Sequence, residues 1–282
     1  MRTIDFEKIA SAIASACIEA NLRLPAEVTA ALEDALARET SARARAILQD
    51  ILRNAELAPQ TGLPLCQDTG LAVVFAELGQ EVRIAGGTLA AAVDEGVRRG
   101  YADGLLRKSV LADPLDRASN TGGNTPAVLH VSLVAGEGLE LTIAPKGGGC
   151  ENASAVWMLT PAQGRAGIIE AIGARVREAG GRACPPLVLG VGLGGSFEQA
   201  ALLAKRAAVL RPLGQPADDE GLAALEADLL AAVNATGIGP MGLGGRTTAL
   251  AVHVESAPCH IASLPLALNV QCHSARHRTV EL

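Results

Sequence analysis

The stretch Leu187–Leu210 reads LVLGVGLGGSFEQAALLAKRAAVL and contains the pattern that decides the fold class. It begins with the apolar run Leu187-Val188-Leu189, which is typical of a buried strand. The glycine-rich run Gly190–Gly195 follows, and Ser196 with Gln199 predicts a capping box that opens a helix. A strand that leads directly into a helix is the building unit of α/β proteins.

The same alternation of helices and strands is expected elsewhere in the chain. Residues 1–57 carry apolar residues at helical spacing, which predicts a helical N-terminal subregion. The run Leu71–Phe75 predicts a buried strand, and alternating apolar residues on both sides of Gly136–Gly138 predict a hairpin. Further strands are expected near residues 247–254 and 264–270. We therefore expect an α/β protein with mixed sheets flanked by helices, forming a single domain over residues 1–282.

The composition excludes several classes of function. The 282 residues are 49% hydrophobic but only 2% aromatic, and the net charge is −6. Nucleic-acid binding uses basic surfaces and stacking rings, which such a chain does not offer. No apolar run is long enough to cross a membrane, and the N-terminus does not have the pattern of a signal peptide. We therefore expect a cytoplasmic protein with neither a nucleic-acid nor a membrane partner.

The run Gly190–Gly195 also fits the G-x-G-x-x-G pattern of dinucleotide-binding proteins. That fold requires an acidic residue about 20 positions later, at the end of a second strand. Here Ala200–Leu210 is expected to be helical and leads into a polar loop. The favoured interpretation is that these glycines allow a strand and a helix to pack closely.

Two other motifs have weak functional interpretations. The triplet Asp68-Thr69-Gly70 matches the aspartic-protease signature, but it occurs once, whereas that chemistry needs two carboxylates. His273 and His277 could bind zinc if they lay on a helix, but the glutamate of the zinc-protease motif is absent. A solvated terminal segment is the better interpretation of these histidines.

Six widely separated cysteines form no C-x-x-C pair, so their spacing alone identifies no metal site. Cys17 falls on the apolar face of the first helix and is interpreted as a core residue. Cys66, Cys184 and Cys272 each lie at a strand or loop boundary, where a thiolate can be directed at a ligand. Their convergence on one iron-sulfur cluster is a hypothesis that the residues alone leave open.

Five blocks, taken in order, resemble a known family. They are Cys66–Gly70 (CQDTG), Asn120–Asn124 (NTGGN), Lys146–Asn152 (KGGGCEN), Cys184–Pro186 with its glycine-rich sequel, and His260 followed by Cys272. Together they resemble the class I iron-sulfur hydro-lyases, which include the oxygen-sensitive fumarate hydratases and the L-tartrate dehydratases. The likeness covers nearly the whole chain from Cys66, and the ordered set is far more specific than any single block.

The resemblance implies that Cys66, Cys184 and Cys272 hold a 4Fe-4S cluster. Three thiolates leave one iron without a protein ligand, and that iron can act as a Lewis acid on the hydroxyl and a carboxylate of a 2-hydroxy acid. No redox change is required.

The resemblance also implies a set of substrate contacts. They are Gln67, Asp68, Arg107, Gly148 and His260. Arg107 would pair with a substrate carboxylate, although it could equally be a surface arginine on a loop. The backbone at Gly148 would approach an anion, unless the glycines only end a hairpin. Asp68 and His260 would be the catalytic residues, acting as an acid-base or orienting pair.

The chain ends at Leu282, shortly after Cys272, whereas longer members of the family continue into a second domain. In those members the second domain supplies further substrate-binding residues and the proposed catalytic base. The comparison implies that this chain is the α subunit of a hetero-oligomeric hydro-lyase, active only with a separate β subunit.

The substrate implied by the resemblance is a small dicarboxylate. A cysteine at position 150 resembles the sequences of the tartrate branch of the family, whereas Glu151-Asn152 resembles those of the fumarase branch. We expect reversible hydration of fumarate to L-malate, a reaction of the tricarboxylic acid cycle, with L-tartrate or mesaconate as the alternative substrates. A different class also stays open, namely a cluster-bearing or metal-free binding module that has kept the scaffold without the chemistry.

Overall fold

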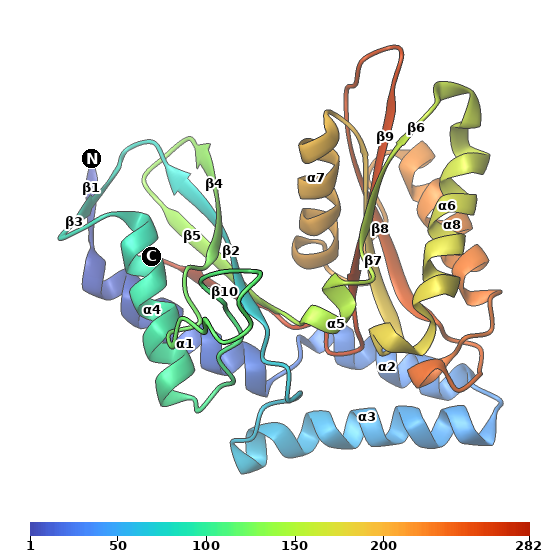
Figure 1. The fold of residues 1–282 in the computed structure, drawn as a ribbon, viewed down its shortest axis with the longest axis horizontal. Helices are drawn as coiled ribbons and strands as arrows, with labels where there is room; N and C mark the ends of the chain where they lie inside the picture. Colours follow the sequence, from blue (N-terminus) through green and yellow to red (C-terminus); the bar gives the residue numbers. More distant parts are fainter. The chain divides into compact units, whose positions relative to one another are not determined.

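The computed structural model describes residues 1–282, which form two compact units (Figure 1). Unit 1 comprises Met1–Pro25, Leu57–Gly148 and Arg276–Leu282. Unit 2 comprises Ala26–Glu56 and Gly149–Ala275. Each unit is therefore built from segments that are distant in the sequence.

Unit 1 is a four-stranded sheet covered by two helices. The strand order is β10-β5-β2-β4, and helices α1 (Phe6–Leu22) and α4 (Leu89–Asp103) pack against each other beside it (Figure 1). The strands are β2 (Leu71–Gly79), β4 (Val128–Val134), β5 (Leu139–Lys146) and β10 (Arg278–Glu281). A separate parallel pair joins β1 (Arg2–Asp5) to β3 (Val82–Ala85).

The periodicity of the first helix is confirmed, because Ile9, Ile13 and Cys17 are fully buried in the core of unit 1. Thr88 caps α4, since its side chain accepts a hydrogen bond from the N–H of Ala91 at 3.2 Å. The helical N-terminal segment predicted from the sequence is therefore present. Its helices divide between the units, since α1 belongs to unit 1 and α2 (Ala26–Arg38) to unit 2.

The hairpin predicted around Gly136–Gly138 is wrong. β4 and β5 do not pair with each other, because β2 lies between them, parallel to β4 and antiparallel to β5. The turn passes over the end of β2, where the N–H of Gly79 donates to the carbonyl of Gly138 at 2.8 Å. A Cβ on Gly79 would lie 2.4 Å from the carbonyl oxygen of Gly136, so this crossing requires glycine.

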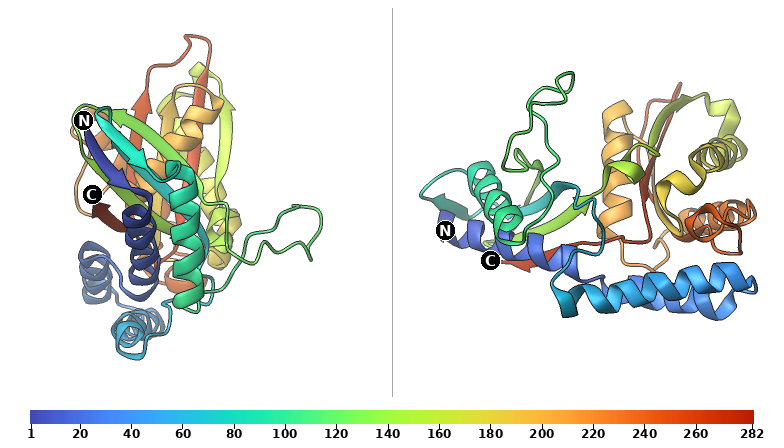
Figure 2. Two further views of the ribbon diagram at one scale, coloured as in Figure 1. Left: turned by 90° about the vertical axis from the view of Figure 1, so that its left-hand side faces the viewer. Right: turned by 60° about the horizontal axis from the view of Figure 1, so that its bottom comes forward.

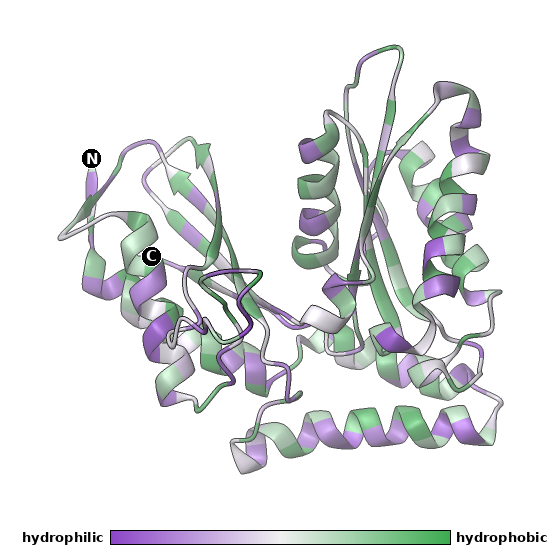
Figure 3. Cartoon of the chain, in the orientation of Figure 1, coloured by the Kyte–Doolittle hydropathy of each residue, from purple (hydrophilic) through white to green (hydrophobic).

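Unit 2 is a sheet with helices on both faces. The strand order is β6-β9-β7-β8; α7 (Phe197–Leu210) covers one face, and α6 (Gly164–Ala179) and α8 (Glu220–Asn234) cover the other (Figure 1). The strands are β6 (Ala155–Leu159), β7 (Leu187–Gly194), β8 (Ala249–Ala257) and β9 (Leu264–Gln271). The inner strands are largely hydrophobic along their length (Figure 3), as expected for a sheet that is covered on both faces.

The remaining elements of unit 2 are connections. Helix α3 (Ala42–Thr61) follows α2 and continues into unit 1, and α5 (Gly148–Glu151) is a single turn between β5 and β6. Three short 3-10 turns complete the chain. They are η1 (Pro161–Gln163), η2 (Gly180–Ala183) and η3 (Pro240–Gly242).

The packing interpretation of the glycine-rich run is confirmed. A Cβ on Gly190 would lie 2.1 Å from the carbonyl oxygen of Ala204, and one on Gly192 would lie 1.9 Å from that of Ala200. Helix α7 therefore rests directly on the backbone of β7, in contact that no larger residue would allow.

The capping box predicted at Ser196 is wrong. The Ser196 side chain makes no capping hydrogen bond, and its hydroxyl lowers the pKa of the nearby Glu198 carboxyl group. The capping box that does form joins Thr160 and Gln163 at the start of η1.

The structure confirms the expected α/β class with mixed sheets flanked by helices. None of its helices combines the length and the apolar character that a membrane span requires.

Candidate functional site

The segment Cys66–Gly70 of unit 1 connects α3 to β2 and carries three of the predicted site residues. It is preceded by Leu65, which is buried and donates its N–H to the carbonyl of Asn21 at 2.8 Å. Cys66 is half-buried and its thiol donates to Oε1 of Gln67 at 3.6 Å, whereas Gln67 is exposed. The thiol and the amide are therefore adjacent and accessible.

Asp68 is held by two backbone N–H groups. Its Oδ1 accepts from Gly70 at 3.1 Å, and its Oδ2 accepts from Gly148 at 2.8 Å. The structure thus brings together two of the predicted contacts, Asp68 and Gly148, which are 80 residues apart in the sequence. Gly70 has φ +74°, and a Cβ there would lie 2.6 Å from the carbonyl carbon of Lys146. The Asp68-Thr69-Gly70 triplet is therefore a tight turn packed on the end of β5.

Arg107 is linked to this turn through its backbone. The Thr69 hydroxyl donates to the carbonyl of Arg107 at 2.8 Å. The guanidinium of Arg107 is exposed and makes no hydrogen bond or ion pair within the chain. It lies in residues 104–127, a long loop that projects from unit 1 and holds one isolated bridge, between Leu111 and Asn120 (Figure 2). Arg107 therefore has donors available for an anionic ligand.

Buried side chains also form hydrogen bonds to the main chain of the same turn. The Tyr101 hydroxyl donates to the carbonyls of Thr69 at 2.7 Å and Gly70 at 3.1 Å. Asn124 is fully buried; its Nδ2 donates to the Gly70 carbonyl at 3.1 Å and its Oδ1 accepts from the N–H of Ser109 at 2.7 Å. The Asn120–Asn124 block thus serves to join the Arg107 loop to the Asp68 turn.

The prediction of a solvated C-terminal segment is wrong. His273 and His277 lie on no helix, and Ser274, Ala275 and Arg276 between them are buried. Arg276 donates from Nη2 to the carbonyl of Asp68. These residues follow no periodic pattern of apolar side chains, so the sequence alone does not predict their burial.

Unit 2 brings two of the predicted cluster ligands to one end of its sheet. Cys184 precedes β7 and Cys272 follows β9, and these strands are antiparallel with Val188 opposite Gln271. The carbonyl of Cys184 accepts from the N–H of His273 at 3.2 Å and from its Nδ1 at 3.0 Å. The backbone of Cys184 adopts the left-handed helical conformation, with φ 54° and ψ 61°.

His260 lies at the opposite end of the same sheet, in the loop between β8 and β9. The eight residues of β9 separate it from Cys272, which at about 3.3 Å per residue is roughly 25 Å. His260 is exposed, and its Nδ1 accepts the N–H of Ala262 at 3.1 Å, which leaves Nε2 to carry the proton of the neutral ring. One chain therefore does not bring His260 together with its own Cys184 and Cys272.

The six cysteines differ in their accessibility, and none forms a disulfide. Cys17 and Cys150 are buried in the two apolar cores, and Cys259 is exposed and donates to the carbonyl of Ser263 at 3.4 Å. The three that are half-buried are Cys66, Cys184 and Cys272. Neither unit by itself gathers three His, Cys, Asp or Glu side chains at metal-binding distances. The donor set of three accessible thiols fits an iron-sulfur cluster.

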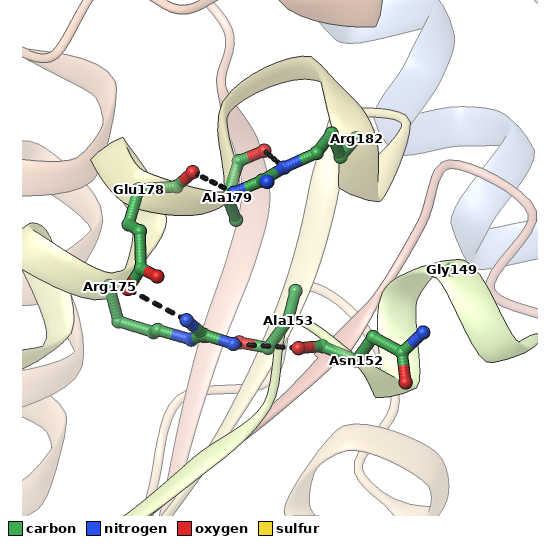
Figure 4. Close-up of a pocket in the computed structure, with 7 residues that line it drawn as sticks. All are labelled: Gly149, Asn152, Ala153, Arg175, Glu178, Ala179 and Arg182. Atoms are coloured by element: carbon green, nitrogen blue, oxygen red, sulfur yellow. Dashed lines mark hydrogen bonds and ion pairs between the residues drawn. The ribbon is translucent and has the colours of Figure 1, made fainter.

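A pocket of about 350 Å³ lies in unit 2, beside the turn that follows Gly148 (Figure 4). Its guanidinium groups are engaged in holding backbone carbonyls: Arg175 donates to Asn152 at 2.6 Å and to Ala153 at 2.9 Å, and Arg182 donates to Ala179 at 3.3 Å. Arg182 thereby satisfies carbonyls at the end of α6. This pocket is consequently part of the scaffold rather than an anion site with available donors.

The residues that suggested different substrate branches are also part of the scaffold. The Cys150 side chain is buried among Ile168 and other core residues of unit 2. Glu151 forms an ion pair with Lys205 and accepts a hydrogen bond from Asn269 Nδ2 at 3.1 Å. Cys150 is therefore a core residue, and the Glu151 carboxylate is engaged by other side chains of unit 2.

Comparison with known proteins gives consistent results. A family model described as fumarate hydratase (Fumerase) matches residues 10–281. A protein of Methanocaldococcus jannaschii named "Putative L(+)-tartrate dehydratase subunit alpha" is 38% identical over 274 residues, which cover 95% of each chain. The L(+)-tartrate dehydratase subunit alpha of Escherichia coli K12 is 29% identical over 275 residues, covering 97% of this chain and 90% of the relative.

Proposed function

Since this chain belongs to the fumarate hydratase (Fumerase) family, we propose that it is the α subunit of a two-subunit hydro-lyase acting on a small 2-hydroxy dicarboxylate. The observation that best supports the proposal is the hydrogen bond between Gly148 and Asp68. Two of the motifs that resemble the family, 80 residues apart, join there through a hydrogen bond of 2.8 Å. A carboxylate held by backbone N–H groups is oriented before substrate binds, which is what catalysis by positioned groups requires.

The ligands of the 4Fe-4S cluster in this proposal are Cys66, Cys184 and Cys272. Their half-buried thiols support the assignment, as does the position of Cys184 and Cys272 at one end of the unit 2 sheet. When bound, the cluster supplies a Lewis acid through its iron without a protein ligand, which polarises the substrate hydroxyl and one carboxylate.

The remaining work falls to side chains of unit 1. The exposed guanidinium of Arg107 has available N–H donors and binds a substrate carboxylate in a bidentate pair. Asp68 is oriented by Gly70 and Gly148, and each of its carboxylate oxygens keeps a lone pair that can accept a hydrogen bond from the substrate hydroxyl and so orient it. Gln67, exposed beside Cys66, orients the same substrate through its amide.

The partner in this proposal is a separate β subunit. Relatives that match along nearly their whole length have names that include the words "subunit alpha". These names support a two-subunit assembly. The β subunit contributes further substrate-binding residues and the base that removes the proton from carbon.

The first candidate substrate is L(+)-tartrate, because the relatives at 29–38% identity are named for it. Fumarate with L-malate, the pair expected from the sequence, is the second candidate and is supported by the name of the matching family. Mesaconate is a third candidate.

The test is anaerobic reconstitution of the chain with iron and sulfide, alone and with its β partner, followed by rates on L(+)-tartrate, L-malate, fumarate and mesaconate. We expect turnover only in the two-chain complex, fastest with tartrate. Full turnover by the single chain would contradict the two-subunit assignment. A complex that binds a cluster but converts none of the four compounds would instead identify an inactive binding module.

A further inference from the structure

Arg276 is a buried arginine without an ion-pair partner. It is only 4% exposed, and of its guanidinium nitrogens only Nη2 makes a hydrogen bond, to the carbonyl of Asp68. Nε and Nη1 are buried and have no hydrogen-bond partner. Burying a charge with unused donors is unfavourable, and an apolar side chain of similar size would avoid that cost. A role in packing alone therefore does not explain an arginine at this position.

The one hydrogen bond of Arg276 completes a series on the turn that carries Asp68. The carbonyls of three consecutive residues, Asp68, Thr69 and Gly70, accept hydrogen bonds from buried side chains. Tyr101 bonds the second and third of these carbonyls, and Asn124 bonds the third. Arg276 alone holds the first, which belongs to Asp68 itself.

This arrangement fixes Asp68 at both its main chain and its side chain. The carboxylate is held by the N–H groups of Gly70 and Gly148, and the carbonyl is held by Arg276. A hydrogen bond from a cation is stronger than one between neutral groups, so the guanidinium is the strongest of the donors to the carbonyls of this turn. The positive charge of Arg276 also acts on the Tyr101 hydroxyl. Burial raises the pKa of Tyr101, and the charge of Arg276 opposes that rise.

We propose that Arg276 is a positioning residue, which holds the Asp68 main chain so that the Asp68 carboxylate stays aimed at the substrate. The catalytic part of this inference rests on the proposed function. The ordering of residues 66–70 by Arg276 does not, and it can be measured without turnover.

The ordering is tested by hydrogen-deuterium exchange on the full chain. In Arg276→Lys and Arg276→Ala we expect the amide of Gly70, which donates to Asp68 Oδ1, to exchange at least about tenfold faster, because the turn opens locally more often. Segments of unit 2 should keep their exchange rates. The matched control is Arg45→Lys, because Arg45 Nη1 also donates to carbonyls, those of Leu36 at 2.7 Å and Glu39 at 3.1 Å, but within unit 2. Unchanged exchange of the Gly70 amide in Arg276→Lys would overturn the proposal.

The catalytic part is tested in the reconstituted two-chain enzyme. We expect Arg276→Lys to lower kcat at least about tenfold with KM within about threefold of the unmodified enzyme, and Arg45→Lys to leave both unchanged. Added guanidinium ion should restore part of kcat to Arg276→Ala, whereas sodium chloride at the same ionic strength should not. A purely structural role predicts no such rescue.

The outcomes are separable. If the unmodified complex has no hydro-lyase activity, the proposed function fails while the exchange experiment still decides the role of Arg276. If Arg276→Ala does not fold, Arg276→Lys decides alone. Faster exchange confined to residues 66–70 supports the inference, and a uniform change across both units contradicts it.

Discussion

At the residue scale, Gly70 determines where Asp68 can lie. Its backbone is left-handed, at φ +74°, and a Cβ would lie 2.6 Å from the Lys146 carbonyl carbon. Gly70→Ala therefore combines a left-handed penalty of about 1–2 kcal/mol with a backbone overlap, and we expect a loss of at least about 3 kcal/mol in the free energy of unfolding.

The matched control for this substitution is Gly62→Ala. Gly62 has nearly the same conformation, φ +71°, but nothing lies within 4 Å of its added Cβ. We expect it to lose only about 1 kcal/mol. Denaturant titrations of both variants measure the difference, and equal losses would show that contact with Lys146 does not constrain the turn.

Asp68 gives the second prediction at this scale. Asp68→Asn keeps the size of the side chain but presents an NH₂ group to one of the two N–H donors, from Gly70 and Gly148, that hold the carboxylate. We expect kcat of the two-chain enzyme to fall at least about a hundredfold, because the carboxylate that orients the substrate hydroxyl is lost. Steady-state kinetics check this, and circular dichroism should show the fold retained. A variant with an unchanged kcat would remove Asp68 from the proposed mechanism.

Individual site residues were predictable from the sequence only where a motif marked them. The CQDTG and KGGGCEN blocks marked Asp68 and Gly148, and the structure joins those two residues. Arg276 had no such mark, because burial of a charged side chain in a loop leaves no periodic pattern. Cys150 was marked by its position in a block, yet it is a core residue. Sequence patterns identify which segments matter, but not which side chains in them face the core.

At the scale of elements, local patterns predicted helices and strands well, but not the pairing of strands. The burial of Ile9, Ile13 and Cys17 follows directly from their spacing. Both β4 and β5 pair with β2, and this pairing depends on contacts between segments that are distant in the sequence. The turn at Gly136–Gly138 therefore led to the wrong prediction of a hairpin. The strand β10 has only four residues, mostly polar, and offered no pattern to recognise.

The antiparallel pairing of β7 with β9 leads to a prediction about the cysteines at its end. After anaerobic reconstitution we expect Cys184→Ser and Cys272→Ser each to lose at least half of the bound iron, because removing one of three thiolates leaves the cluster poorly held. Cys259→Ser is the control, since Cys259 is exposed and its bond to the Ser263 carbonyl can be made by a hydroxyl. Iron assays measure the effect.

Alkylation gives a second measurement of the same assignment. Bound cluster should protect Cys66, Cys184 and Cys272 from iodoacetamide, while Cys259 continues to react. Equal iron in Cys184→Ser and Cys259→Ser, or equal alkylation of all four thiols, would show that the ligand set is wrong.

At the scale of the whole molecule, the predicted site residues divide between the two units. Cys66, Gln67, Asp68, Arg107 and Gly148 belong to unit 1, and Cys184, Cys272 and His260 belong to unit 2. The sequence contained no linker to mark this division, because the chain passes between the units inside continuous blocks. One crossing falls between Gly148 and Gly149, within KGGGCEN, and another between Ala275 and Arg276.

The position of His260 in unit 2 restricts how it can contact substrate, which is the role that the family resemblance implies. It lies at the opposite end of a rigid sheet from Cys184 and Cys272, roughly 25 Å away, whereas a four-carbon diacid is under about 10 Å long. If His260 contacts substrate, it does so in the site of a second copy of the chain. We therefore expect enzyme assembled from a mixture of Cys184→Ser and His260→Ala chains to be more active than either variant assembled alone, since a mixed pair contains one complete set.

The control mixture combines Cys184→Ser with Cys272→Ser, in which no site has all its ligands in any arrangement, and it should stay inactive. Rates with the preferred substrate, measured against the fraction of each variant, distinguish the two mixtures. Recovery in the first mixture alone establishes that two copies share each site. If the first mixture is as inactive as the control, His260 does not act across copies, and a full rate in His260→Ala alone would mean that this histidine has no part in the reaction.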